Sequence, residues 1–176
     1  QGDVSVEDFL QAGYLPDALI NFVSLLGFNP TGDREIYTRE ELQDTFELSK
    51  VNKSGAVFDR EKLSWMNGQY IKTMPAEELL TITQEIIPEA NDIDENVLNK
   101  ILSVEKERIS TVLEFSERFP MYTEKLAFEA EELVWKKADL EDAKLHLTNI
   151  AKVIDKADES DFATIETIEG VVRNYI

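Results

Sequence analysis

The residues with the most distinctive chemistry are basic side chains that gather around glycine-containing turns in the first part of the chain. They are Arg34, Lys50, Lys53, Arg60, Lys62 and Lys72. Lysine and arginine in such a group suit contacts with nucleic-acid phosphates, because most of the affinity for a phosphate backbone comes from these two cations. The alternative is a scatter of surface salt bridges, which add little to stability. The residues alone leave both interpretations open.

Two groups of side chains resemble metal-binding patterns, but each fits a structural role better. Asp92–Asn96 begins like a calcium loop, yet Val97 stands where that loop needs glycine and Ser103 where it needs glutamate. We interpret these residues as a helix start. His146 follows Asp142 by four residues, but the chain has one histidine and no cysteine, so a solvated or capping role is favoured. We expect no metal site.

Sets of residues that carry out catalysis are missing from the sequence. It contains no glycine-rich phosphate loop, no serine–histidine–aspartate set and no paired-glycine dinucleotide motif. The carboxylates are numerous, but their helical spacing favours solvated faces over acid–base pairs. We expect no catalytic residue and no cofactor-binding residue in this chain.

Short helices must position the basic residues, and their start and stop signals are clear in the first part of the chain. Ser5 opens a capping-box pattern, and Thr38 opens another. Pro16 suits the first turn of a helix that ends at Gly27. Asp59 is the expected N-cap of the helix that carries Arg60, Lys62 and Lys72.

That helix contains the most unusual pattern of the chain, the run WMNGQYI at residues 65–71. Helical spacing places Met66 and Tyr70 on a buried face, with Trp65 beside them. Gly68 does not fit this simple pattern, because glycine in a helix interior costs about 1 kcal/mol relative to alanine. A glycine kept between two aromatic residues indicates that another group approaches the backbone closely.

The second part of the chain is predicted to be nearly continuous helix. Six of the seven glycines lie at or before Gly68, so we place a boundary at Lys72–Pro75. The predicted helices lie between Pro75 and Pro88 and at 94–115, 129–136, 140–154 and 164–175, with an interruption at Phe119-Pro120. The expected fold class is mainly α: a small helical domain over residues 1–73, followed by an all-helical bundle or cage over residues 74–176.

The acidic composition limits how the chain could bind nucleic acid. The net charge is −18, whereas phosphate-binding proteins usually carry a basic patch. Residues 1–75 hold 7 Lys+Arg and 12 Asp+Glu, a net of −5, and residues 76–176 hold 11 and 24, a net of −13. Any contacts with RNA must therefore be few and precisely placed.

Other features of the composition bear on the setting of the chain. The absence of cysteine fits a reducing, cytosolic compartment. No apolar run approaches the roughly 20 residues that cross a bilayer. The chain begins Gln1-Gly2-Asp3 and ends in mid-pattern, so we expect it to be a piece of a longer protein.

Six ordered blocks of the sequence resemble bacterial-type glutamyl-tRNA synthetases, which are class I enzymes. The blocks are GDVSVEDF at 2–9, GYLPDALINF at 13–22, LGF at 26–28, REIYT at 34–38, VFD at 57–59 and WMNGQYI at 65–71. They stand in the same order as in that family, where they follow a Lys-x-Ser-Lys-Arg signature loop. The helical remainder is similar more loosely, in its helix pattern and in VLEF at 112–115.

The resemblance implies a tRNA-binding role. Such an enzyme uses ATP with magnesium to activate glutamate and transfers it to the 3′ end of tRNA(Glu). Residues 1–73 would be its stem-contact domain, and residues 74–176 the first helical subdomain of its anticodon-binding region. The Rossmann catalytic core would lie upstream of Gln1, so this piece would be inactive alone. A cytoplasmic monomer without membrane contact is expected.

The resemblance also suggests which residues contact tRNA. Arg34, Lys53, Arg60, Lys62 and Lys72 would be contacts of the stem-contact part. Alignment of Thr111–Phe115 with a Thr-Leu-Lys-Glu-Phe-like stretch of the family places Arg108 where an arginine can read the third anticodon base. The planar guanidinium suits a base edge or a ring face. The alternative is a surface arginine paired with Glu105 or Glu107.

Two rival interpretations remain at this point. An acidic, all-helical protein–protein interaction module would explain the charge and the helices, but not the ordered blocks. A piece of the related glutaminyl enzyme would explain the blocks, but its anticodon region is expected to be a β-barrel. The helical prediction for residues 76–176 argues against that second rival.

Overall fold

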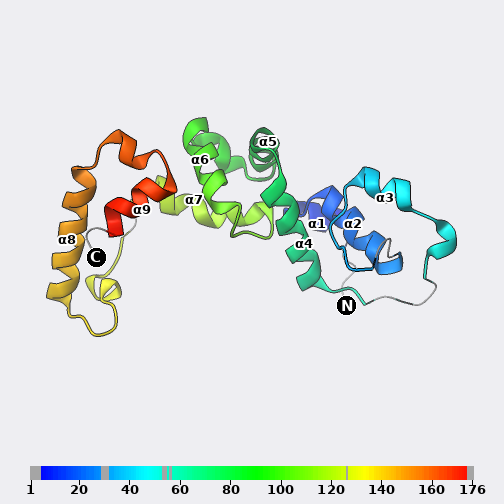
Figure 1. Cartoon of the computed structure of the whole chain (residues 1–176), viewed down its shortest axis with the longest axis horizontal. Helices are drawn as coiled ribbons and strands as arrows, with labels where there is room; N and C mark the ends of the chain where they lie inside the picture. The colour runs from blue at the N-terminus through cyan, green and yellow to red at the C-terminus, as the bar shows by residue number, and fades with distance from the viewer. Residues whose placement is uncertain (1–4, 29–31, 53–54, 56, 126, 174–176) are drawn as a thin grey trace. The chain divides into compact units, whose positions relative to one another are not determined.

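The computed structural model describes residues 5–28, 32–52, 55, 57–125 and 127–173. The chain divides into two compact units, Gln1–Lys125 and Leu126–Ile176, and Figure 1 draws their helices along the chain. The described residues form helices and contain no β-strand, which confirms the mainly α fold class. None of their helices is both long and apolar enough to cross a membrane.

The described residues of the first unit form seven α-helices. They are α1 (Val6–Gln11), α2 (Pro16–Gly27), α3 (Arg39–Thr45), α4 (Arg60–Thr73), α5 (Ala76–Ile86), α6 (Glu95–Glu105) and α7 (Phe115–Thr123), with 3₁₀ turns at Leu48–Lys50, Pro88–Asp92 and Val112–Glu114. Capping boxes at Ser5 and Thr38 begin α1 and α3, and Asp59 caps α4 through the Lys62 amide. These predicted helix starts are therefore confirmed.

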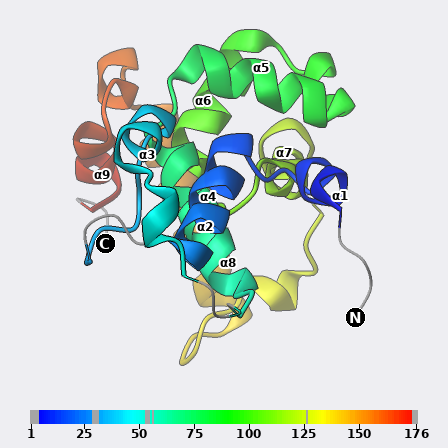
Figure 2. The ribbon, with the colours of Figure 1, turned by 90° about the vertical axis from the view of Figure 1, so that its right-hand side faces the viewer.

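The core of the first unit consists of two apolar clusters that share α4. Leu63 and Met66 of α4 pack with Phe9, Tyr14 and Phe22 in the first cluster. Ile71, two turns further along α4, belongs to the second cluster, which extends from Leu15 to Phe119 and is built largely from α5, α6 and α7. Figure 2 shows α4 beside α2, its main partner in the first cluster. The first unit thus includes residues on both sides of the predicted boundary at 72–75.

The glycine of α4 lies where another part of the backbone comes close. A Cβ atom on Gly68 would lie 3.1 Å from the carbonyl oxygen of Ile109, so the expected close approach is present and comes from the chain itself. Met66 is fully buried, as predicted. Trp65 is 45% exposed, because the buried stripe of α4 leaves its side of the helix open.

The predicted helix over residues 94–115 is wrong in its length, because α6 ends at Glu105. The following backbone bonds to other elements instead of continuing the helix. Ser110 O accepts from Asn67 Nδ2 at 2.6 Å, and Val112 N donates to Gly13 O at 3.0 Å. A capping box at Thr111 then opens a new helical segment.

The predicted interruption at Phe119-Pro120 is also wrong, since Pro120 lies inside α7. Proline in a helix removes one hydrogen bond and crowds the preceding turn. Here the helix ends three residues later at Thr123, and Phe115 and Phe119 are buried with their rings stacked 6.4 Å apart. Apolar packing therefore holds the helix across the proline.

The second unit contains α8 (Leu140–Asp155) and α9 (Ile165–Arg173) among its described residues. Asp139 caps α8, which matches the prediction for residues 140–154 closely. The predicted helix at 129–136 is reduced to a 3₁₀ turn at Ala130–Leu133. A second 3₁₀ turn, Glu159–Phe162, precedes α9.

Candidate functional site

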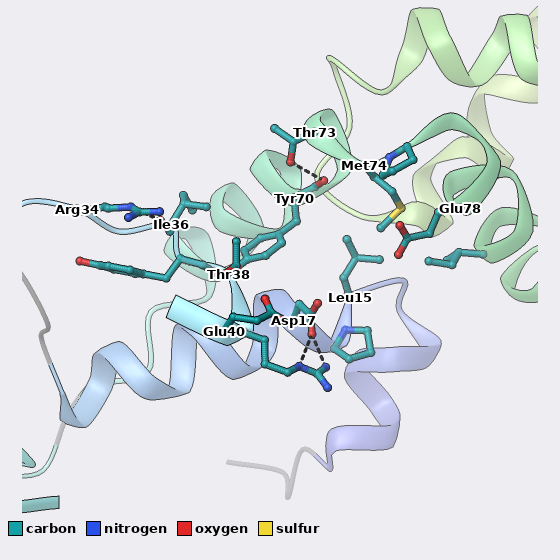
Figure 3. A pocket seen from close by; sticks show the side chains of 15 residues that line it. Leu15, Asp17, Arg34, Ile36, Thr38, Glu40, Tyr70, Thr73, Met74 and Glu78 are labelled. Carbon is teal, nitrogen blue, oxygen red and sulfur yellow. Dashed lines mark hydrogen bonds and ion pairs between the residues drawn. The ribbon is translucent and has the colours of Figure 1, made fainter. Parts of the chain in front are cut away.

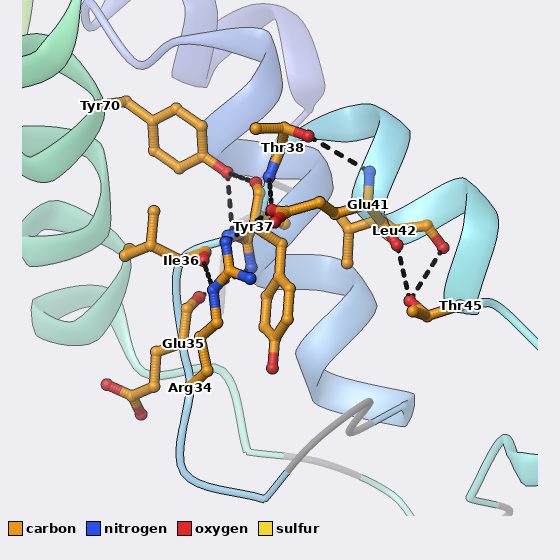
Figure 4. Close-up of polar contacts among 10 residues, drawn as sticks. Arg34, Glu35, Ile36, Tyr37, Thr38, Glu41, Leu42, Thr45 and Tyr70 are labelled. Carbon is orange, nitrogen blue, oxygen red and sulfur yellow. Dashed lines mark hydrogen bonds and ion pairs between the residues drawn. The ribbon is translucent and has the colours of Figure 1, made fainter.

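The segment 34–38, which carries the first of the predicted contact residues, is fixed between α2 and α4. The buried side chain of Asn21 donates to Glu35 O at 3.0 Å and accepts from Tyr37 N at 2.8 Å. The Tyr70 hydroxyl lies 2.5 Å from Tyr37 O and 2.8 Å from Asn21 Oδ1 (Figure 4). Buried polar groups are retained when their bonds are satisfied, so this network holds the segment in place.

Arg34 lies at the start of this segment with one edge of its guanidinium engaged. Its Nε donates to Ile36 O at 2.8 Å, its Nη2 pairs with Glu41 at 2.6 Å, and its guanidinium carbon lies 4.6 Å from the Tyr37 ring centre. The bond to Glu41 raises the pKa of Arg34, and Arg34 with the Thr38 amide lowers the pKa of Glu41. The side chain is 53% exposed, so a ligand can reach it.

Lys62 of α4 pairs with the segment that carries Arg34, whereas Arg60 lies apart from both. Lys62 Nζ pairs with Glu35 Oε1 at 2.5 Å. Arg60 is two positions earlier on α4, and residues two apart face different sides of a helix. Its guanidinium carbon lies 5.6 Å from the ring centre of Phe9. Arg34 lies on the segment and Lys62 pairs with its next residue, Glu35, and we call these two basic residues the segment site.

A second group lies at the other end of α4. Lys72 Nζ is 3.9 Å from Glu107 Oε2, and the next residue, Arg108, places its Nη1 3.2 Å from Glu105 Oε1. Residues 60 and 72 are separated by about 18 Å along the helix axis, at 1.5 Å per residue. The predicted contacts thus occur at two places along α4, and Lys53 lies outside the described residues.

The basic residues of both groups form ion pairs with carboxylates, as the salt-bridge interpretation predicts. Arg34, Lys62, Lys72 and Arg108 each pair with a glutamate, and Lys50 pairs with Glu47 at 2.6 Å. The pairs of Arg34, Lys62 and Lys72 are at the surface and contribute about 0–1 kcal/mol each, so a phosphate group can replace their carboxylates at little cost. Salt bridges in the free chain are compatible with phosphate contacts in a complex.

Glu105, which the sequence suggested only as a partner of a surface arginine, pairs with Arg108 and is buried. Its side chain is 3% exposed, accepts from the Tyr122 hydroxyl at 2.5 Å, and lies 3.8 Å from Arg118 Nε. Arg118 and Tyr122 are four residues apart on α7 and therefore face the same way. This i, i+4 spacing, together with the i, i+3 spacing of Glu105 and Arg108, was the signal available in the sequence.

An open pocket of about 550 Å³ lies beside the segment site (Figure 3). Leu15, Ile36 and Met74 supply apolar walls, and the opposite charges of Asp17 and Arg39 are paired with each other. None of the pocket residues forms a nucleophile–base pair, so the pocket suits binding rather than catalysis.

The structure offers little support for metal chemistry in the part of the chain that it describes. No group of three histidine or acidic side chains there could hold an ion. Asp94, from the calcium-like stretch, accepts from the amides of Asn96 and Val97 and caps α6, as a helix start requires. His146 stacks edge-on against Trp135, with ring centres 5.5 Å apart.

Comparison with known proteins gives consistent matches. The family model for class I tRNA synthetases (E and Q), catalytic domain, matches residues 2–65. The glutamate–tRNA ligase of Prosthecochloris aestuarii is 32% identical over 100% of this chain and 37% of its own length. That of Clostridium botulinum is 31% identical over 99% of the chain and 36% of its own length. The chain thus spans about a third of the length of these relatives.

A solved structure agrees with these sequence matches. The crystal structure of a glutamate tRNA ligase from Elizabethkingia meningosepticum, in complex with its amino acid, covers 95% of this chain with a TM-score of 0.73 and 29% identity. This chain covers 32% of that protein. A likeness of this extent shows a shared fold.

Proposed function

The chain is homologous to glutamate–tRNA ligases over most of its length, and from this premise we propose that it provides tRNA binding for such an enzyme. The observation that carries the proposal is the alignment of 99–100% of the chain with about a third of these ligases. The whole protein would attach glutamate to tRNA(Glu) with ATP in the cytoplasm. The 176 residues alone would be inactive.

In this proposal residues 1–73 contact the tRNA stem. Arg34 lies on the segment that the Asn21–Tyr37–Tyr70 network fixes, and Lys62 of α4 pairs with Glu35 of that segment, so both residues are anchored before RNA binds. A preorganised pair loses less conformational entropy on binding than two mobile side chains. Arg60 and Lys72 extend the contact along α4, and Lys53 is proposed on the resemblance alone.

Residues 74–176 contact the anticodon arm, with Arg108 as the residue that reads a base. Its side chain is 66% exposed and only its Nη1 bonds to Glu105, so its remaining donors can address a base edge. The role of these contacts is positioning: fixing the stem and the anticodon sets where the acceptor end meets activated glutamate. Correct orientation of the reactants lowers the activation free energy of such reactions substantially.

Fluorescence anisotropy of labelled tRNA(Glu) with the 176-residue chain tests the proposal. We expect saturable binding that weakens with added salt, and weaker binding to a tRNA with an unrelated anticodon. Arg108→Gln should reduce this preference, whereas Arg173→Gln, in α9 and paired with Glu169, should not. Absence of tRNA binding at low salt would contradict the proposal and favour the acidic protein–protein interaction module.

A further inference from the structure

We propose that Arg118 and Tyr122 form, with Arg108, a site for one unstacked nucleobase and its phosphate in single-stranded RNA, positioned by the buried carboxylate of Glu105. The inference rests on the proposed tRNA-binding function. It adds to it two residues of α7 that neither the sequence motifs nor the comparisons single out.

Glu105 is the centre of this site, because its charge cannot stay buried without partners. Removing a carboxylate from water is costly unless it is paired and hydrogen-bonded. Glu105 Oε1 accepts from both Arg108 Nη1 and the Tyr122 hydroxyl, and Oε2 faces Arg118 Nε. One carboxylate at the end of α6 therefore draws together three side chains from two segments.

The site carries a local positive charge in an acidic chain. Two guanidinium groups face one buried carboxylate, which leaves one net positive charge. The neighbouring Glu107 pairs with Lys72. The Nε of Arg118 is buried and has no hydrogen-bond partner among the described residues, since 3.8 Å is too long for a hydrogen bond. Arg118 is thus held at its Nε by charge, and because its side chain is 38% exposed, the outer part of the guanidinium can reach a ligand.

The exposed parts of the three side chains suit a nucleobase. Tyr122 has its hydroxyl anchored on Glu105, yet the residue is 41% exposed, so part of its ring faces solvent. Unstacked RNA bases bind on aromatic rings and on guanidinium planes, with hydrogen bonds to their edges. An arginine also binds phosphate through parallel donors. One ring, two guanidinium groups and a net positive charge match a base and its phosphate.

Glu105 acts here as a positioning residue and Tyr122 as a contact residue. Two variants of Tyr122 therefore separate the bond to Glu105 from the contact of the ring. Tyr122→Phe removes the bond to Glu105 and keeps the ring. Tyr122→Leu removes the ring. Stacking of a base on an aromatic side chain has a large effect on binding when the ring is lost. We expect about tenfold weaker binding of tRNA(Glu) for Tyr122→Leu and a smaller loss for Tyr122→Phe.

The test measures anisotropy with intact tRNA(Glu) and with three transcripts, each abasic at one anticodon position. For one transcript the Tyr122→Leu variant should bind as wild type does, because the base is already missing, and Arg118→Gln should lose less affinity than with the other RNAs, because only the phosphate contact remains to be lost. Arg39→Gln, an exposed arginine paired with Asp17, is the control and should lose affinity equally for all four RNAs or not at all. Thermal melting by circular dichroism checks that each variant is folded.

The outcomes separate this inference from the proposed function. If the wild-type chain fails to bind tRNA(Glu), both are overturned. If it binds, and the loss from Tyr122→Leu and Arg118→Gln is the same for every abasic transcript or is absent, the base-binding site is overturned and the tRNA-binding function stands. If Tyr122→Leu does not fold, Arg118→Gln and Tyr122→Phe decide by the same comparison of transcripts.

Discussion

The side-chain amide of Asn67 in α4 donates a hydrogen bond of 2.6 Å to the main-chain oxygen of Ser110, so the helix of the segment site is tied to the loop that carries Arg108. The same side chain accepts from Leu15 N at 2.8 Å through its Oδ1. One buried amide therefore connects α4, the entry to α2 and the loop between α6 and α7. This loop carries Arg108, and α4 carries Lys62 and Lys72.

Asn67→Ala should destabilise the first unit strongly. It removes two short buried bonds and leaves main-chain groups of Leu15 and Ser110 unsatisfied, and each such group costs about 1–3 kcal/mol. We expect a loss of about 2–4 kcal/mol in the free energy of unfolding by urea. The fluorescence of Trp65 in a Trp135→Phe background reports on this unit.

The control for Asn67 is Asn91→Ala. Asn91 also donates two bonds to main-chain oxygens, but it does so at the surface, where water can replace them. We expect a loss below about 1 kcal/mol. Equal losses for the two variants would show that Asn67 does not connect buried elements.

Three glycine-to-alanine substitutions should have different effects on stability. Gly13 has φ +82°, and its Cβ would lie 2.5 Å from Leu113 N, so this variant should be the most destabilised. At Gly68 the Cβ would meet Ile109 O at 3.1 Å. Hydrogen bonds with Asn67 and Gly13 hold the loop at 109–112 in place. We therefore expect Gly68→Ala to lower the free energy of unfolding by about 1 kcal/mol, although alanine has the better helix propensity.

Gly170 in α9 is the third position and the control. Nothing lies within 4 Å of its added Cβ, so alanine should stabilise this helix by up to about 1 kcal/mol. Urea unfolding of the three variants gives the order of stability. A Gly68→Ala variant more stable than wild type would mean that the Ile109 carbonyl can move away.

Ionisation of Tyr70 should make the first unit less stable at high pH. Burial, with the nearby charge of Asp17, raises the pKa of Tyr70 to about 12 from an ordinary value of 10. The unfolded chain therefore releases this proton first, so stability is full below pH 10 and falls as the pH rises toward 12. Because the ring is only partly buried, solvent screens the effect and we expect a loss of only about 1 kcal/mol.

Two measurements check this pH dependence. Urea unfolding as a function of pH should show the fall in wild type and a smaller fall in Tyr70→Phe. Near-ultraviolet absorbance of the phenolate should lose one late-titrating tyrosine in the same variant. An unchanged pH profile in Tyr70→Phe would exclude Tyr70 as the cause.

Removing the charges of the segment site should weaken tRNA binding in a salt-dependent way. Each lost phosphate contact lowers the slope of log affinity against log salt by about 0.7–0.9. We expect the Arg34→Gln, Lys62→Gln double variant to show weaker binding and a slope reduced by about 1.5. Arg39→Gln is the matched surface control. If the slope of the double variant equals that of wild type, these two residues do not contact phosphate.

The helix starts in the first unit could be predicted because their causes are local. Ser5, Thr38 and Asp59 bond to amides only three residues away, and a pattern of single residues records such bonds. The end of α6 could not be predicted in this way. It depends on Asn67 and Gly13, which are distant in the sequence and bond to Ser110 and Val112.

The candidate site divides in the same manner. The basic residues could be read directly from the sequence, and the order of its blocks showed the family resemblance. A short alignment gave the position of Arg108. The pairing of Arg108 with Glu105 was one of the alternatives, but the contacts of Glu105 with Arg118 and Tyr122 were not visible, because they form only when α7 packs against α6. A predicted helix through residues 94–115 would have placed Arg108 on a continuous helix face instead of a loop.

The sequence by itself determined the helical class, the caps and the kind of enzyme to which this chain is related, because these depend on neighbouring residues and on ordered motifs. Tertiary structure alone decided how the basic residues are grouped. Lys62 joins Arg34 through Glu35, and Lys72 lies beside the loop of Arg108 through Glu107. The physical reason is that packing on both sides of α4 brings distant charges together, and no local pattern of residues records those distances.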